Sequence, residues 1–82
     1  MSNKVVLSYK NIEKKVEFPK CYDDLQKIFL QEFNEDKNKK FSFCYVDNEG
    51  DENDINNHAD LTYALEEFLN NPNMKIIICE IV

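Results

Sequence analysis

The fold is decided by an acidic stretch of the sequence, Cys44-Tyr45-Val46-Asp47-Asn48-Glu49-Gly50-Asp51-Glu52-Asn53-Asp54-Ile55. Apolar residues lead into this stretch, and Gly50 is the only glycine of the chain, the residue type that most readily adopts the positive φ of a tight turn. We therefore predict a strand, a turn at residues 48–50, a short second strand and then a helix. Carboxylates held this close together repel one another, which favours a positively charged partner.

Length, charge and cysteine content limit the function classes. The 82 residues suffice for one domain, residues 1–82, and 43% hydrophobic residues can fill one core. A net charge of −6 argues against nucleic acid or an anionic membrane as the partner, because both require a basic surface. Three cysteines without a CxxC pair favour neither disulfides nor zinc, so we expect a reducing, cytoplasmic location. The sequence contains no apolar run long enough for a signal peptide or a membrane span.

The residues before the acidic stretch predict a hairpin followed by a helix. Apolar and polar side chains alternate over residues 4–10 and again over residues 15–18, where Pro19 ends the second strand. Asn11 is a suitable turn residue between the two strands. Over residues 22–33 the apolar positions follow helical spacing, which predicts an amphipathic helix that packs on the sheet.

The residues after the acidic turn predict a second helix and a last strand. Asn57 and Asp60 form a variant of the capping box, so a helix should begin there, although Asp60 could serve the cap alone. Five apolar side chains continue this helix at core spacing: Leu61, Ala64, Leu65, Phe68 and Leu69. The nearly continuous apolar run over residues 74–82 predicts a central strand buried on both faces. The order β-β-α-β-β-α-β is that of an α+β fold with a mixed sheet, the ubiquitin-like β-grasp.

The run from Tyr45 to Asp51, followed by Ile55, Asp60, Leu61 and Ala64, resembles the octicosapeptide (OPCA) motif of the Phox-and-Bem-one (PB1) domain. In element order the resemblance extends over essentially the whole chain. PB1 domains are interaction modules that pair front to back in signalling, scaffolding or selective autophagy. The acidic motif of one domain docks on a lysine-centred basic face of another. The resemblance implies a set of partner-binding acids, Asp47, Glu49, Asp51 and Asp60, with Glu52 and Asp54 as outer contributors.

The chain departs from the basic class of this family, which carries a lysine on the first strand. That position falls at Val6, or at Leu7 in a register one residue away, and neither residue is basic. The resemblance therefore implies an acidic-only domain that forms a heterodimer with a basic-class PB1 partner. Lys14 and Lys15 lie near the positions of the family's supporting arginines, which leaves weak self-association through these lysines as an alternative.

Other interpretations of the acids have less support. A calcium-binding turn is one alternative, but placing Gly50 at the sixth position of an EF-hand loop puts Tyr45 first and Asn56 twelfth, where an aspartate and a glutamate are required. His58 is the only histidine and has no nucleophile arranged beside it, so we expect no enzyme, cofactor or metal. A ubiquitin-type modifier would need a glycine-ending tail, which residues 80–82 do not supply.

Overall fold

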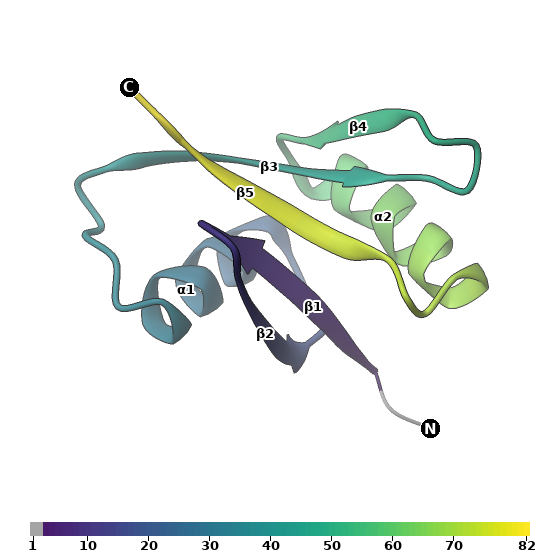
Figure 1. Ribbon diagram of the computed structural model, residues 1–82, viewed down its shortest axis with the longest axis horizontal. Helices are drawn as coiled ribbons and strands as arrows, with labels where there is room; N and C mark the ends of the chain where they lie inside the picture. Colours follow the sequence, from purple (N-terminus) through teal and green to yellow (C-terminus); the bar gives the residue numbers. More distant parts are fainter. Residues whose placement is uncertain (1–2) are drawn as a thin grey trace.

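The computed structural model describes residues 3–82; Met1 and Ser2, which belong to the predicted domain of residues 1–82, lie outside the described residues. Seven elements follow in the predicted order: β1 (Lys4–Tyr9), β2 (Ile12–Glu17), α1 (Tyr22–Glu32), β3 (Lys40–Val46), β4 (Glu52–Ile55), α2 (His58–Asn70) and β5 (Lys75–Ile81). The five strands form one sheet in the order β2-β1-β5-β3-β4, in which only β1 and β5 are parallel neighbours. Figure 1 shows β5, in yellow, between β1 and β3. The predicted β-grasp with a mixed sheet is confirmed.

A two-residue turn closes the opening hairpin. Tyr9 pairs with Ile12, and the two residues between them, Lys10 and Asn11, have φ of 51° and 66°. Positive φ at both central positions gives the turn the twist that antiparallel strands require. Asn11 tolerates this conformation well, as the sequence predicted, and the second strand begins earlier than predicted, at Ile12.

The core lies between one face of the sheet and the two helices. Phe29 of α1 is fully buried at its centre, with its ring 5.1 Å from that of Tyr9, 4.7 Å from that of Phe41 and 5.9 Å from that of Phe43. All three contacts are edge-to-face, the geometry that aromatic pairs favour. In β1 the buried side chains alternate with more exposed ones, as predicted for a half-buried strand.

Two predictions about burial are wrong. β5 is central, but its second face is open: Ile76 and Ile78 are buried, whereas Ile77 is half-buried and Cys79 is exposed. The buried side chains of α1 and α2 belong to the same core as Ile76 and Ile78, so no helix is left to cover the other face.

The apolar stripe of α2 is also wider than its contact with the sheet. Leu61, Ala64 and Phe68 are buried, but Leu65 and Leu69 are 36% and 63% exposed. Three positions at i, i+3 and i+7 are sufficient to face the sheet, and the other two rotate away from it.

Candidate functional site: an acidic strip along β4

The turn between β3 and β4 is held by a carboxylate. Asp47 Oδ1 accepts hydrogen bonds from the backbone N–H groups of Glu49 (3.0 Å) and Asp51 (2.9 Å), and its Oδ2 accepts one from Asn53 Nδ2 (3.0 Å). The bond from Asn53, followed by that from the Asp51 backbone, lowers the pKa of Asp47 below the usual 3.8. Gly50 adopts φ of 86° and donates its N–H to the Asp47 carbonyl. Asp47 therefore shapes the turn as well as carrying charge.

A second carboxylate holds the start of α2. Asn57 Oδ1 accepts from the N–H of Asp60 at 2.9 Å, and Asp60 Oδ2 accepts from the N–H of Asn56 at 2.9 Å. The predicted reciprocal cap is confirmed, except that Asp60 reaches the residue before Asn57. This pair satisfies two backbone donors that the helix and its entry would otherwise leave free. Asp60 remains half-buried rather than enclosed, so part of its carboxylate faces solvent.

The predicted partner-binding acids follow the length of an edge strand. We name this surface the acidic strip: Asp47, Glu49, Asp51, Glu52, Asp54 and Asp60. Strand β4 lies at the edge of the sheet, with the turn at one end and the start of α2 at the other (Figure 1). The acids are therefore spread along β4 rather than gathered in one knob. Charged side chains on an edge strand also discourage unwanted strand pairing, a structural role that the same residues could have.

One hollow brings two members of the strip together. Asp54 of β4 and Asp60 of α2 line a depression of about 270 Å³ with Tyr45, Asn53 and Tyr63. Burial, followed by the carboxylates of Glu67, Asp47 and Asp60, raises the pKa of the Tyr45 phenol. The Asp60 carboxylate beside the Tyr45 ring forms an environment that suits an ammonium or guanidinium group.

The ion pairs that involve Lys39 and Lys75 lie outside the acidic strip. The ion pairs within residues 3–82 join Lys39 to Glu35 and Glu80, and Lys75 to Glu13. None of these glutamates belongs to the strip. Lys39 and Lys75 therefore do not neutralise the strip.

Two residues of this site were missed in the sequence. Asn53 bridges the turn, because its side-chain amide donates both to Asp47 and to the Asp51 carbonyl. Tyr63 is 63% exposed at the hollow. A signal existed for Tyr63, since it follows Asp60 by three residues on a helix and must share its face.

Lys14 and Lys15, the two lysines of the self-association alternative, lie on opposite faces of the sheet. In the β1–β2 ladder Val6 is opposite Lys15, whereas buried Leu7 is opposite Lys14. Successive side chains of a strand point to opposite faces, so Lys14 lies on the helix side. There its Nζ donates to the Glu32 carbonyl at the end of α1 and lies 5.3 Å from the centre of the Phe33 ring.

The potential metal ligands of residues 3–82 are dispersed, and Cys44 is a weakly acidic thiol. Residues 3–82 contain no group of three or more His, Cys, Asp or Glu side chains that could hold a metal ion. All three cysteines are free, and burial followed by the charge of Glu52 raises the pKa of Cys44 to about 11. A thiol with so high a pKa is a poor nucleophile at neutral pH.

Neither α1 nor α2, the helices within residues 3–82, has the length and apolar character needed to cross a bilayer.

The arrangement of the elements matches known structures. No family model and no curated protein matches the sequence. The structure titled "Cryo-EM structure of AtNBR1-PB1 filament (L-type)" superposes with a TM-score of 0.76 at 18% identity, covering 96% of this chain and 99% of that one. The chain has the fold of a PB1 domain. The structure titled "AtNBR1-PB1 domain" gives a TM-score of 0.70 at 15% identity, with the same coverage. The PB1 fold places the acidic strip on its β3–β4 hairpin and the start of its second helix.

Proposed function

We propose that this chain is a non-catalytic PB1 interaction module whose acidic strip docks on the basic face of a second PB1 domain. The observation that carries the proposal is a row of carboxylates along the edge strand β4, and the ion pairs of Lys39 and Lys75 involve only glutamates outside this row. The PB1 fold and the resemblance of residues 45–64 to the OPCA motif support it. The three free cysteines fit a reducing, cytoplasmic setting for signalling, scaffolding or autophagy.

The two ends of the strip serve the interaction differently. Asp54, Asp60 and Tyr63 form a hollow that receives one lysine or arginine of the partner. Asp51 and Glu49 present further acceptors at the turn, where Asp47 fixes the backbone. Charge-assisted hydrogen bonds are each worth about 1.5–3 kcal/mol, whereas exposed rim pairs are worth less than about 1 kcal/mol. Binding therefore depends on several acids acting together, and added salt weakens it.

Calorimetric titration tests this proposal. The probe is a PB1 domain that carries the first-strand lysine of the basic class. The variant Glu52→Lys with Asp54→Lys should bind it at least about tenfold more weakly, because two acceptors become repulsive cations. Both side chains are exposed, and neither forms a hydrogen bond within residues 3–82 that supports the turn or the helix. The circular dichroism spectrum should therefore stay unchanged.

A matched control separates the strip from net charge. Glu17→Lys with Glu32→Lys makes the same change in charge at exposed positions of β2 and α1. This variant should retain affinity within about twofold, since its positions lie outside the strip. If both variants lose affinity equally, the effect comes from net charge and not from the strip. If neither variant loses affinity, the proposal is wrong.

Self-association is a second candidate function. On the open face of the sheet, Val6 has Lys15 on one side and Lys75 on the other, while the strip lies at the opposite edge. Opposite charges at opposite edges permit head-to-tail contact between copies. The Nζ of Lys75 lies 2.6 Å from Oε2 of Glu13 and is already paired, so substitution of Lys15 is the better test of self-association. Lys15→Glu should shift concentration-dependent oligomers toward monomer in sedimentation velocity; an unchanged distribution counts against this candidate.

A further inference from the structure

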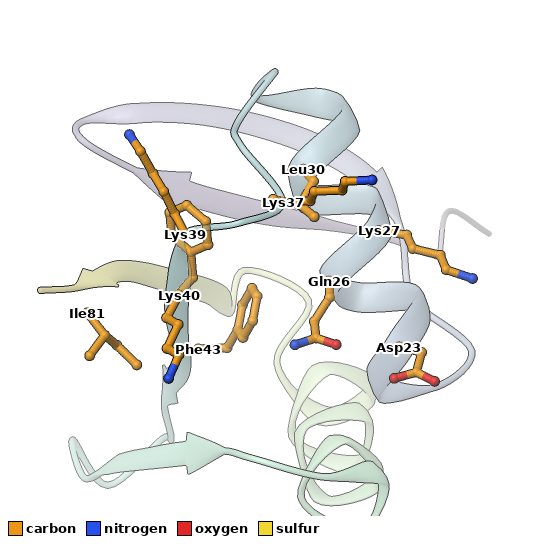
Figure 2. Close-up of a pocket in the computed structure, with 10 residues that line it drawn as sticks. Asp23, Gln26, Lys27, Leu30, Lys37, Lys39, Lys40, Phe43 and Ile81 are labelled. Carbon is orange, nitrogen blue, oxygen red and sulfur yellow. The ribbon is translucent and has the colours of Figure 1, made fainter.

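A second surface of the molecule is a groove between α1 and the start of β3. It encloses about 420 Å³. Its apolar lining consists of Leu30, Phe41, Phe43 and Ile81. Figure 2 shows Gln26 of α1 and Phe43 of β3 facing each other across this space. Phe43 is 2% exposed and belongs to the core, whereas Phe41 and Leu30 are half-buried and leave apolar surface open to the groove.

Lysines surround this apolar floor. Lys27 comes from α1, Lys37 from the connection that follows it and Lys40 from the first position of β3. Figure 2 shows these side chains extending away from the floor, with Lys27 and Lys37 on the α1 side and Lys40 on the β3 side, and we call their three ammonium groups the rim. None of the three forms an ion pair within residues 3–82. A protein with a net charge of −6 thus carries a local positive rim, with Asp23 as the one acid that lines the groove.

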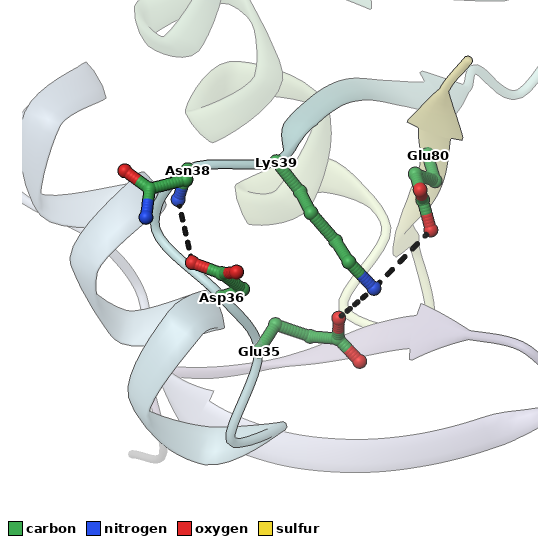
Figure 3. Close-up of polar contacts among 5 residues, drawn as sticks. All are labelled: Glu35, Asp36, Asn38, Lys39 and Glu80. Atoms are coloured by element: carbon green, nitrogen blue, oxygen red, sulfur yellow. Dashed lines mark hydrogen bonds and ion pairs between the residues drawn. The ribbon is translucent and has the colours of Figure 1, made fainter.

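Lys39 differs from these three lysines. Its Nζ lies 3.8 Å from a carboxylate oxygen of Glu35 and 4.0 Å from one of Glu80 (Figure 3). These contacts tie the connection to the end of β5. Lys39 is therefore already partnered, and the free positive charge of the rim rests on Lys27, Lys37 and Lys40.

The backbone beside the groove is also available. β4 pairs with β3 only over Phe43–Val46, while β5 pairs with β3 from Lys40 onward. On the side away from β5, residues 40–42 therefore have no strand neighbour within the described chain. An unpaired strand edge can accept an extended peptide through main-chain hydrogen bonds.

We propose that this groove binds an extended acidic segment of a partner protein. One large apolar side chain of the segment occupies the space between Leu30 and Phe41, above Phe43, and its flanking carboxylates meet Lys27, Lys37 and Lys40. Charge complementarity selects an acidic partner, and a concave apolar floor selects a single inserted side chain rather than a flat surface. The groove shares no residue with the acidic strip, so it provides the module with a second, oppositely charged contact.

Amide chemical-shift titration tests the proposal on the intact chain. The probe is a blocked hexapeptide with one phenylalanine flanked by glutamates. Saturable shifts should be confined to residues 26–30 of α1, Lys37 of the connection and residues 40–43 of β3. Peptides in which serine replaces the phenylalanine, or lysines replace the glutamates, should lose at least about tenfold in affinity, because each lacks one half of the recognition.

Variants of the chain make the test specific. Lys37→Glu with Lys40→Glu should weaken binding at least about tenfold, whereas the control Lys10→Glu with Lys20→Glu makes the same charge change at exposed positions outside the groove and should not. Equal binding of the lysine peptide, equal effects of the two variants, or no shifts would overturn the proposal. So would binding to phosphatidylserine vesicles without binding to the peptide, which would make the groove a membrane contact. Glu52→Lys with Asp54→Lys should bind the peptide normally, so the two surfaces are tested independently.

Discussion

The acidic strip and the lysine-rimmed groove carry opposite charges and are built in opposite ways. The strip is continuous in sequence, and its own carboxylates accept hydrogen bonds from the backbone that shapes it. The groove joins α1, a loop, β3 and the end of β5, and its floor is part of the aromatic core. In the strip, the charged side chains themselves hold the local backbone in place. In the groove, the lysines surround a floor whose shape depends on the packing of the aromatic core. Substitutions in the two surfaces should therefore change the stability of the chain by different amounts and for different reasons.

The largest expected effect is at the floor of the groove. Phe43→Ala removes a ring that is 2% exposed and lies 5.9 Å from the ring of Phe29 and 6.1 Å from that of Tyr22. We expect the free energy of unfolding to fall by about 3–5 kcal/mol, since a large buried side chain is replaced by a cavity. Urea denaturation monitored by circular dichroism measures this change.

A matched substitution in the same groove should cost far less. Ile81 is 54% exposed at the groove's outer end, so Ile81→Ala should lower the free energy of unfolding by less than about 1 kcal/mol. Similar losses at Phe43 and Ile81 would show that the groove does not depend on the core, and the contrast with the strip would fail.

A smaller effect is expected at the helix end of the strip. Asn57→Ala removes the side chain that accepts the N–H of Asp60, while all six carboxylates of the strip remain. Loss of such a cap typically costs about 1 kcal/mol, within a range of about 0.5–2 kcal/mol. Thermal unfolding measures the change.

The neighbouring asparagine supplies the control for this cap. Asn56 contributes only its backbone N–H to Asp60, so Asn56→Ala should stay within about 0.5 kcal/mol of the parent chain. If Asn57→Ala is equally silent, the start of α2 does not depend on the local hydrogen bonds of the strip.

The difference between the two surfaces also explains what the sequence could predict. The strip, the turn at Gly50 and the Asn57–Asp60 cap depend on residues a few positions apart, and local patterns predicted all three. The groove depends on segments that only the folded chain brings together, so no spacing rule revealed it. Residue type likewise could not say which face the helices cover, which is why the exposure of Leu65 and of Cys79 was missed.

Alternation in a strand already separates the two lysines of the self-association alternative. Lys14 and Lys15 are consecutive residues of β2, so they must lie on opposite faces once the strand is assigned. The self-association alternative rests on the resemblance, which sets both lysines near the family's supporting arginines, and of the two only Lys15 lies on the open face of the sheet. Of the two lysines, Lys14 lies on the helix side, where its Nζ donates to the Glu32 carbonyl at the end of α1.

The smallest expected effect separates charge from structure within the strip. The pKa of Asp47 is lowered in the folded chain below 3.8, so its carboxylate contributes stability that is fully present above about pH 4. That contribution is lost as the pH falls through the lowered pKa, where protonation weakens the bonds from Asn53 and the backbone. Asp47→Asn should therefore lower the midpoint of thermal unfolding at about pH 7, and its difference from the parent chain should shrink as the pH falls below 3.8. Glu49→Gln makes the same charge change in the same turn, but the Glu49 side chain holds no hydrogen bond within residues 3–82, so its effect should not vary with pH in this way. If both variants gave parallel pH curves, Asp47 would act only through its charge, and the strip would no longer differ from the groove in how it is built.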